Sequence, residues 1–284
     1  MKEFMLTSGE NLQVILFLST LVLFIGAERL IPRRRPASPQ VSRWKTNGGL
    51  TLATIALLPL VPVSFISASF WAQSNGFGLF NHYSSAIPPV IAVLLTLLIR
   101  AFVSFGTHYL NHKVPLLWRF HRVHHLDTEL DVSSTVRFHP LEMPLSMVIG
   151  LPVVVLFGLS PWVLIFYELL DVCVTLFSHS NIRLAPGLNR YLRYVIVTPD
   201  LHLVHHSSYR EETDSNYSAV FPIWDILFGT FRVETRAPLQ SMELGLEEVR
   251  DSRAHRFWWL LVSPFLPIHR PLPHSHLSET GAAP

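Results

Sequence analysis

Three long apolar runs constrain this chain more than any other feature of its sequence. Residues 12–27, 48–71 and 88–107 carry a single charged side chain between them, Arg100. With its flanks, each run reaches the roughly 20 apolar residues that cross a bilayer as a helix. Only 15% of the chain is charged, well below the quarter usual in soluble domains. The sequence therefore predicts an integral membrane protein.

The first run could also be read as a signal peptide. Glu28 and Arg29 follow it directly, without the small-residue pattern that precedes a cleavage site. We therefore expect a retained helix. In the second run, Pro59 and Pro62 predict a kink, and Trp71 is expected at the far membrane interface.

Two shorter apolar stretches, 143–157 and 161–178, are separated by Gly158 and Pro161. Each is short for a full span, so together they predict a hairpin that either crosses the membrane twice or re-enters it. The expected fold class is all-α, with about four transmembrane helices and a cytoplasmic helical cap.

The side of the membrane follows from the basic residues, because short basic loops remain cytoplasmic. The loop between the first two runs is basic, whereas residues 72–87 contain no Lys or Arg. This count places the segments after residue 107 on the cytoplasmic side. The basic residues of the first loop are Arg29, Arg33, Arg34, Arg35, Arg43 and Lys45.

Histidines gather in this cytoplasmic part in three motifs: one H-x-x-x-H pair and two H-x-x-H-H triplets. Residues three and four apart share a helix face, so we expect each motif to present one face and the three faces to converge. Imidazole is costly to bury without partners and is the commonest metal ligand. The pattern predicts a metal centre among His108, His112, His121, His124, His125, His139, His179, His202, His205 and His206.

The remaining histidines are scattered, and we expect them on the surface or in loops. They are His82, His255, His269, His274 and His276. The one cysteine, Cys173, excludes an intrachain disulfide and is expected to be a small buried apolar residue.

Eight to ten nitrogen donors suggest two metal ions rather than one structural zinc, which takes four ligands. No Glu-x-x-His occurs in the chain, which sets it apart from soluble di-iron bundles. Imidazole suits Fe, Zn, Cu and Ni alike. A site at a membrane surface suits oxidation of lipid C–H bonds, which needs a redox metal, and this favours iron over zinc.

The three motifs and their flanks resemble the histidine boxes of the fatty acid hydroxylase / sterol desaturase superfamily, and most closely its bacterial branch. The resemblance covers about residues 88–232. The matching flanks are Leu117–Phe120, Asp131–Glu142, His179–Leu184, Asn216-Tyr217, Trp224-Asp225 and Phe228–Thr230.

The resemblance implies a non-haem di-iron oxygenase in the bacterial inner membrane. It would use O2 to hydroxylate or desaturate an alkyl chain of a lipid or sterol at the cytoplasmic face. All ten histidines above would be iron ligands or, for His139, either a ligand or a neighbour of one. Some relatives have a further histidine where this chain has Arg183.

Electrons would come from NAD(P)H through a separate reductase and a cytochrome b5 or ferredoxin type carrier, because the chain has no spare length for a haem or flavin domain. The alternative from a different class is a non-enzymatic membrane metal-binding protein or haem electron carrier. Clustered triplets argue against a bis-histidine haem site, which needs single histidines on facing helices.

Several supporting roles are also expected. Carboxylates or amides that orient the ligands are sought among Asp131, Glu142, Asp200, Asp225 and Asn181. Asp200 is alternatively an N-cap, Gly229 should end a short helix, and residues 257–266 should form an interfacial helix or pack on the membrane domain. The expected division is 1–87, N-terminal spans; 88–232, catalytic domain; 233–284, interfacial segment and loose tail.

Overall fold

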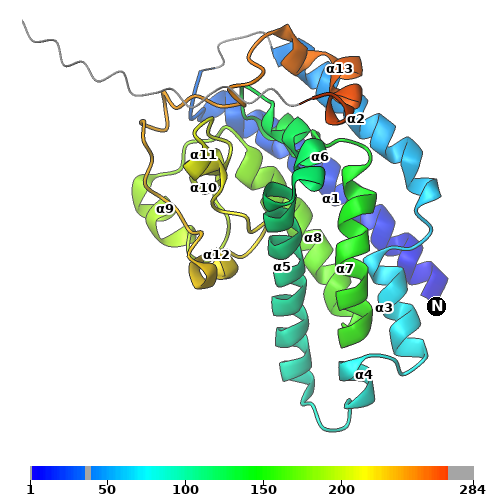
Figure 1. The fold of residues 1–284 in the computed structure, drawn as a ribbon. Helices are drawn as coiled ribbons and strands as arrows, with labels where there is room; N and C mark the ends of the chain where they lie inside the picture. Colours follow the sequence, from blue (N-terminus) through cyan, green and yellow to red (C-terminus); the bar gives the residue numbers. More distant parts are fainter. Residues whose placement is uncertain (1, 36–39, 268–284) are drawn as a thin grey trace, which may run out of the picture.

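The computed structural model describes residues 2–35 and 40–267, where every regular element is a helix (Figure 1). Four segments there are long and apolar enough to cross a membrane, which confirms the expected all-α fold. The C-terminal tail, with His269, His274 and His276, lies outside the described residues. The four segments are Asn11–Leu30, Gln40–His82, Pro89–Lys113 and Pro161–His179.

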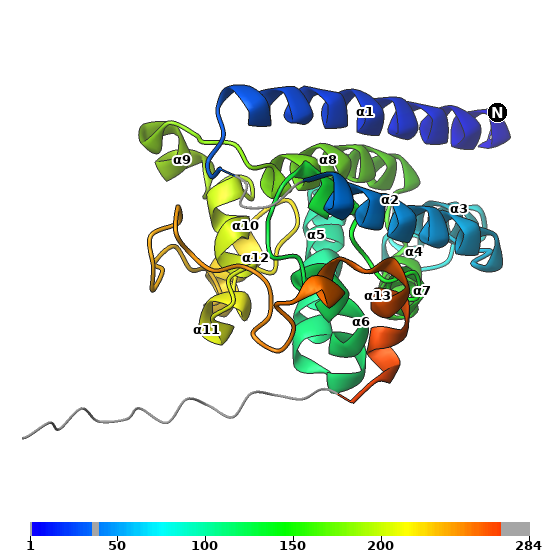
Figure 2. The ribbon, with the colours of Figure 1, turned by 90° about the horizontal axis from the view of Figure 1, so that it is seen from above.

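The first helix, α1 (Lys2–Leu30), lies along the outside of α8 (Pro161–His179), as the view from above shows (Figure 2). Its last turn is anchored by Glu28, whose Oε1 accepts hydrogen bonds from the main-chain N–H groups of Val132 and Asn181, both at 2.7 Å. The first helix is therefore tied to the segments that carry the histidines.

The second apolar run is broken rather than merely kinked. Helix α2 (Gln40–Leu57) passes into a 3-10 turn, η1 (Leu58–Leu60), with Pro59 in its first turn, and the chain restarts as α3 (Phe65–Ser74). Ser64 caps α3 by accepting the Ser67 main-chain N–H at 3.1 Å. The short α4 (Leu79–His82) then leads to the third span.

The third run forms α5 (Pro89–Lys113), and the expected hairpin forms α7 (Glu142–Phe157) and α8. The three helices run beside one another in Figure 1. Gly158 ends α7 with φ 64°, and a Cβ there would lie 2.7 Å from Asn81 Nδ2 and 2.9 Å from the Phe77 carbonyl oxygen. The hairpin turn therefore requires glycine.

A cap of short helices covers the end of α5 and α8 at which both helices finish (Figure 1). Gly229 ends its α12 in the left-handed region, with φ 71°, as expected. The elements of the cap are α6 (Pro115–His125), η2 (Val132–Val136), α9 (Pro186–Leu192), α10 (Pro199–His205), α11 (Arg210–Thr213), α12 (Ile223–Phe228), η3 (Ser252–His255), α13 (Phe257–Val262) and η4 (Ser263–Phe265).

The segment at 257–266 packs on the protein: Leu260 of α13 is fully buried in a cluster with Leu50 of α2 and Val123 of α6. The structure thus has the expected packing on the membrane domain, and the interfacial position stays a prediction. Burying such side chains stabilises each by about 1.5–3 kcal/mol.

Buried ion pairs join α2 to the segment after α6. The Arg43 side chain is 2% exposed and donates to both oxygens of Asp127, at 2.7 and 2.9 Å, and to Asp131 Oδ2 at 2.9 Å. Arg137 donates to Asn47 Oδ1 at 2.9 Å and to the Val123 carbonyl at 2.9 Å. These charges would be costly to bury unpaired, so the pairs hold the segment in one position.

Candidate metal centre

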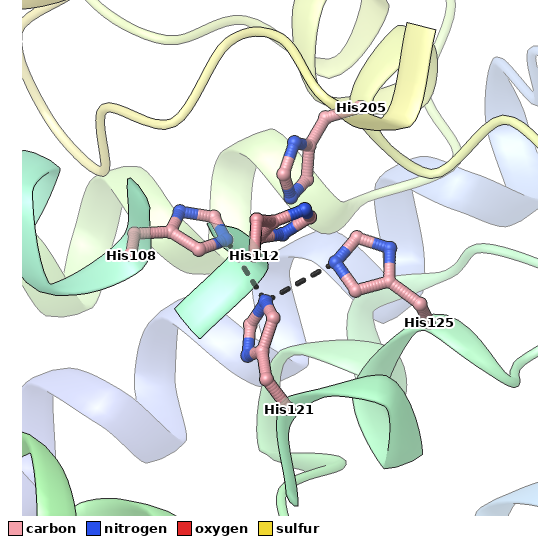
Figure 3. A group of neighbouring side chains, drawn as sticks. All are labelled: His108, His112, His121, His125 and His205. Carbon is pink, nitrogen blue, oxygen red and sulfur yellow. Dashed lines mark hydrogen bonds between the residues drawn. The ribbon is translucent and has the colours of Figure 1, made fainter. Parts of the chain in front are cut away.

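Nine of the ten predicted histidines come together in two adjoining groups. In each group, one ring nitrogen from every histidine lies within 4.8 Å of all the others. We call them the five-histidine group (His108, His112, His121, His125 and His205; Figure 3) and the four-histidine group (His124, His179, His202 and His206).

Each H-x-x-H-H triplet divides between the two groups. On α6, His121 and His125 join the five-histidine group, while His124 between them joins the other. After α10 begins, the same pattern appears in reverse, because His205 alone joins the five-histidine group. The expectation that each triplet presents a single face to one centre is therefore wrong.

The two groups are in direct contact. The rings of His125 and His206 are stacked, with centroids 4.6 Å apart, and those of His124 and His206 are 4.5 Å apart. Two metal ions held in the two groups would therefore be neighbours.

Within the five-histidine group, outer ring nitrogens meet main-chain carbonyls and carboxylates. His108 Nδ1 donates to the Tyr217 carbonyl at 2.7 Å, and His205 Nδ1 donates to the Ser215 carbonyl at 2.6 Å. His121 Nδ1 is 2.6 Å from Glu142 Oε1. Another carboxylate, that of Asp214, lies with Oδ1 3.3 Å from His112 Nδ1. Such bonds fix the tautomer and direct the other nitrogen inward.

In the described residues, the outer ring nitrogens of the four-histidine group meet main-chain carbonyls and one hydroxyl, that of Ser178, whose Oγ lies 3.5 Å from His179 Nδ1. His124 Nδ1 donates to the Arg137 carbonyl at 3.2 Å, and His179 Nδ1 donates to the Thr175 carbonyl at 2.8 Å. The Nδ1 atoms of His202 and His206 are buried without a partner in the described part of the chain.

The inward nitrogens approach one another closely in both groups. Nε2 of His108 lies 3.0 Å from Nε2 of His121, and Nε2 of His124 lies 3.3 Å from Nε2 of His179. All four residues direct Nδ1 at an oxygen acceptor, so in the neutral rings each Nε2 presents a bare lone pair. Lone pairs facing at this distance repel unless a cation lies between them. The donor set therefore fits a bound metal ion.

Burial keeps five of the grouped imidazoles neutral. It lowers the pKa of His205 to about 3, and burial together with neighbouring imidazoles holds the pKa values of His124, His125, His202 and His206 well below the ordinary value. Neutral imidazole is the form that binds metal, so the rings are ready as ligands at neutral pH.

His139 belongs to neither group. Its Nε2 donates to the Leu261 carbonyl at 3.1 Å, and its Nδ1 accepts the Leu141 main-chain N–H at 3.2 Å. Both ring nitrogens are thus occupied in joining α13 to the start of α7. The structure separates His139 from the other nine predicted ligands.

Of the five residues expected to support the ligands, Glu142 alone touches one with its side chain. Asp131 pairs with Arg43, and Asn181 accepts the Arg34 main-chain N–H at 2.9 Å. The N-cap expectation for Asp200 is wrong, because Thr198 precedes the helix and Asp200 instead pairs with Arg33 at 2.9 Å.

Asp225 touches no histidine of either group but holds the loop whose carbonyls, those of Ser215 and Tyr217, accept hydrogen bonds from His205 and His108. Its two oxygens accept the main-chain N–H groups of Tyr217 and Ser218 at 2.7 and 2.8 Å and the Thr230 hydroxyl at 2.6 Å. Asn216, at φ 53°, also holds the loop by donating to the Arg232 carbonyl at 2.8 Å. The Asn-Tyr and Trp-Asp stretches therefore position carbonyls against His108 and His205.

Sequence reasoning missed Asp214. It lies in a polar loop with nothing in its spacing to connect it with His112, 102 residues away. The roles of the Ser215 and Tyr217 carbonyls could not be predicted either, because every residue type carries the same main-chain acceptor.

A cavity of about 330 Å³ opens beside both groups. His108 and His121 of one group and His124, His179 and His202 of the other line one part of it. Side chains from α3, α5, α7 and α8 line most of the rest, including Phe65, Val103, Ser146 and Thr175. The cavity therefore joins the histidines to the interior of the membrane-spanning helices.

Comparison with known proteins agrees with the motifs. The family model described as fatty acid hydroxylase matches residues 93–230. An ornithine lipid hydroxylase of Rhizobium tropici is 28% identical over 243 residues, which is 82% of this chain and 70% of that protein. A cholesterol 25-hydroxylase-like protein of Danio rerio is 30% identical over 162 residues, 54% of this chain and 61% of that protein.

A human alkylglycerol monooxygenase is 29% identical over 137 residues, 46% of this chain. The match spans only 29% of that relative's length. No solved structure matches the chain significantly.

Proposed function

Because the chain belongs to the fatty acid hydroxylase / sterol desaturase superfamily, we propose that it is a membrane-bound, O2-dependent di-iron oxygenase that hydroxylates an alkyl chain of a lipid. The observation that carries the proposal is the pair of histidine groups, whose bare nitrogens face one another beside a cavity reaching into the membrane helices. Relatives of 28–30% identity are named as lipid or sterol hydroxylases and monooxygenases, which supports hydroxylation over desaturation.

The nine grouped histidines would hold two iron ions, one in each group. Iron would supply the redox chemistry that oxygen insertion into a C–H bond requires and that zinc lacks. His139 is left out of this ligand set, because both of its ring nitrogens are used elsewhere.

The chain's own residues then have separable tasks. Main-chain carbonyls and the carboxylates of Glu142 and Asp214 hold each imidazole in the tautomer that points a lone pair inward. The low exposure of the histidines, with His205 at 0% and His125 at 1%, excludes bulk water from the ligands. The cavity aligns an alkyl chain against the two groups, which is the positioning that intramolecular reactivity needs.

We also propose a cytoplasmic site in the bacterial inner membrane, with NAD(P)H electrons delivered by a separate reductase and a small carrier protein. The basic loop between α1 and α2 supports this orientation. Arg33 and Arg34 also contact Asp200 and the Met242 carbonyl, at 2.9 and 2.6 Å. Residues 88–232 would form the catalytic domain.

The alternative of a haem carrier fits the geometry less well. A bis-histidine haem needs one imidazole on each side of a flat macrocycle. Here five ring nitrogens in one group and four in the other each converge within 4.8 Å, which leaves no plane for a porphyrin.

Metal analysis of the detergent-purified protein, together with its absorption spectrum, tests the proposal. We expect about two irons per chain without a haem Soret band, and hydroxylated lipid when reductase, carrier and O2 are supplied. A Soret band, or failure to bind iron even after anaerobic reconstitution, would overturn it.

A further inference from the structure

A second polar cluster lies inside the membrane-spanning helices, away from the histidines. Arg100 on α5 comes eight residues before His108, and Asp171 on α8 comes eight residues before His179. At about 1.5 Å of rise per residue, each lies roughly 12 Å along its helix from that histidine. Both line the same cavity as the histidines.

Arg100 is fixed in place. Its Nε and Nη2 atoms each lie 2.8 Å from Glu168 Oε1, and its Nη1 donates to Ser104 Oγ at 2.6 Å. The guanidinium carbon also lies 4.9 Å from the ring centres of Phe65 and of Tyr167. Glu168 balances the charge of Arg100, while two of its five N–H groups remain for another acceptor.

Asp171 is not balanced in this way. Its Oδ1 is buried and has no hydrogen-bond partner in residues 2–35 and 40–267. A carboxylate in an apolar span is costly without a donor, and such intramembrane groups usually serve a substrate path or site. The cavity in front of it is where a donor would have to come from.

Resting on the lipid hydroxylase function proposed above, we propose that Asp171 is a specificity-determining residue that binds a hydrogen-bond donor within the substrate chain, an amide N–H or a hydroxyl. The free N–H groups of Arg100 bind the oxygen of the same group. The favoured substrate is therefore a lipid whose chain carries an internal amide or hydroxyl about 12 Å from the carbon that is oxidised.

Such a contact would fix the position of the alkyl chain along the cavity. An alkyl chain in a mainly apolar cavity can slide by one methylene at small cost, because a hydrophobic wall discriminates weakly between positions. A polar group bound at a fixed distance from the irons sets which carbon lies beside them. A site built to bond a donor also rejects analogues that lack it.

Binding to the metal-free protein in nanodiscs separates this proposal from the enzymatic one. The probes are three chains of equal length, with an internal amide, an internal hydroxyl or only methylenes, competing with a fluorescent alkyl probe. We expect the amide or the hydroxyl chain to bind at least about tenfold more tightly than the methylene chain, since bonds to charged groups are the stronger kind. Which of the two polar chains binds better identifies the group.

Asp171→Leu removes the acceptor, and Asp171→Asn keeps its shape without its charge. Removing an unpaired buried charge should not unfold the protein. We expect Asp171→Leu to bring the ratio of the two dissociation constants, methylene chain over polar chain, close to one, because the polar chain binds more weakly. Ser74→Ala removes a hydroxyl that bonds the Phe70 carbonyl within α3 and leaves the cavity lining in place, so it should keep the preference.

Equal binding of all three chains by the wild-type protein would overturn this inference, whether or not the enzyme turns over. An unchanged preference in Asp171→Leu would overturn it as well, even with reduced turnover, because Asp171 would then act on something other than the chain. If the iron-loaded protein hydroxylates no lipid but the protein still binds the polar chains more tightly, the proposed reaction is wrong and the inference about Asp171 stands.

Discussion

The five-histidine and four-histidine groups are built from the same two triplets, yet their surroundings differ. Two carboxylates, Glu142 and Asp214, contact the first group, whereas main-chain carbonyls and the Ser178 hydroxyl contact the second. The first group also has one more histidine. Negative charge next to an imidazole N–H raises the basicity of its other nitrogen, so the two metal positions should differ in affinity.

Removal of a ligand should have the largest effect. His205→Ala should empty the five-histidine group and His124→Ala the four-histidine group. Either change should lower activity by more than the roughly 10–100-fold that outer-partner changes cost. Iron per chain, measured by mass spectrometry, should fall from two toward one.

The matched control is His82→Ala, an exposed histidine on α4. It should keep the wild-type iron content. Full iron content in His205→Ala or His124→Ala would remove that residue from the ligand set.

Neutralising the carboxylates should affect one group only. Glu142→Gln and Asp214→Asn keep side-chain shape but remove the charge beside His121 and His112, and each should weaken one of the two irons by about 10–100-fold. Chelator competition should show one iron released early and the other at the wild-type concentration. Glu243→Gln, at a side chain that is 74% exposed, is the control. Equal weakening of both irons would mean that the groups share their charge environment.

Loosening the loop that carries the Ser215 and Tyr217 carbonyls should weaken iron binding less, and again in the five-histidine group. Asp225→Asn weakens the bonds that hold Tyr217 and Ser218, at a cost of about 1–3 kcal/mol. A lower Tm and looser iron binding are expected, in a variant that still inserts and folds. An unchanged Tm would show that Asn216 suffices to hold the loop.

The smallest effect concerns the histidine outside both groups. Burial lowers the pKa of His139, so the unfolded chain takes up a proton at this residue at higher pH than the folded chain does. Stability from His139 is therefore full above its ordinary pKa near 6.5 and is lost as pH falls below it. Thermal unfolding between pH 7 and 5 should show a shallower pH slope in His139→Gln, at unchanged iron content. A loss of iron in this variant would show that His139 contributes to the metal centre.

The sequence was sufficient to predict the spans, an irregularity near Pro59, the glycine that ends α12 and the gathering of histidines, although the predicted kink is a full break. It could not predict how each triplet divides. Positions i, i+3 and i+4 lie on neighbouring parts of one helix surface, and only the approach of α6 to α10 determines which ring meets which group.

Supporting contacts were harder to predict for a related reason. Asp214 and Glu142 reach their imidazoles across 102 and 21 residues of chain, and no local pattern encodes such a distance. The expectation for Asp200 failed because an N-cap preference is local, whereas Arg33 reaches this carboxylate from 167 residues away.

The bond from Glu28 to Val132 and Asn181 has a consequence for biosynthesis. A ribosome releases α1 long before either of those residues, so the carboxylate at its end waits unpaired while the later spans are inserted. The same holds for the rings of His108 and His112, whose group is complete only once His205 has emerged. The complete donor set is thus offered to a metal ion only late in synthesis, and a chain stalled before α10 would expose an incomplete set of imidazoles.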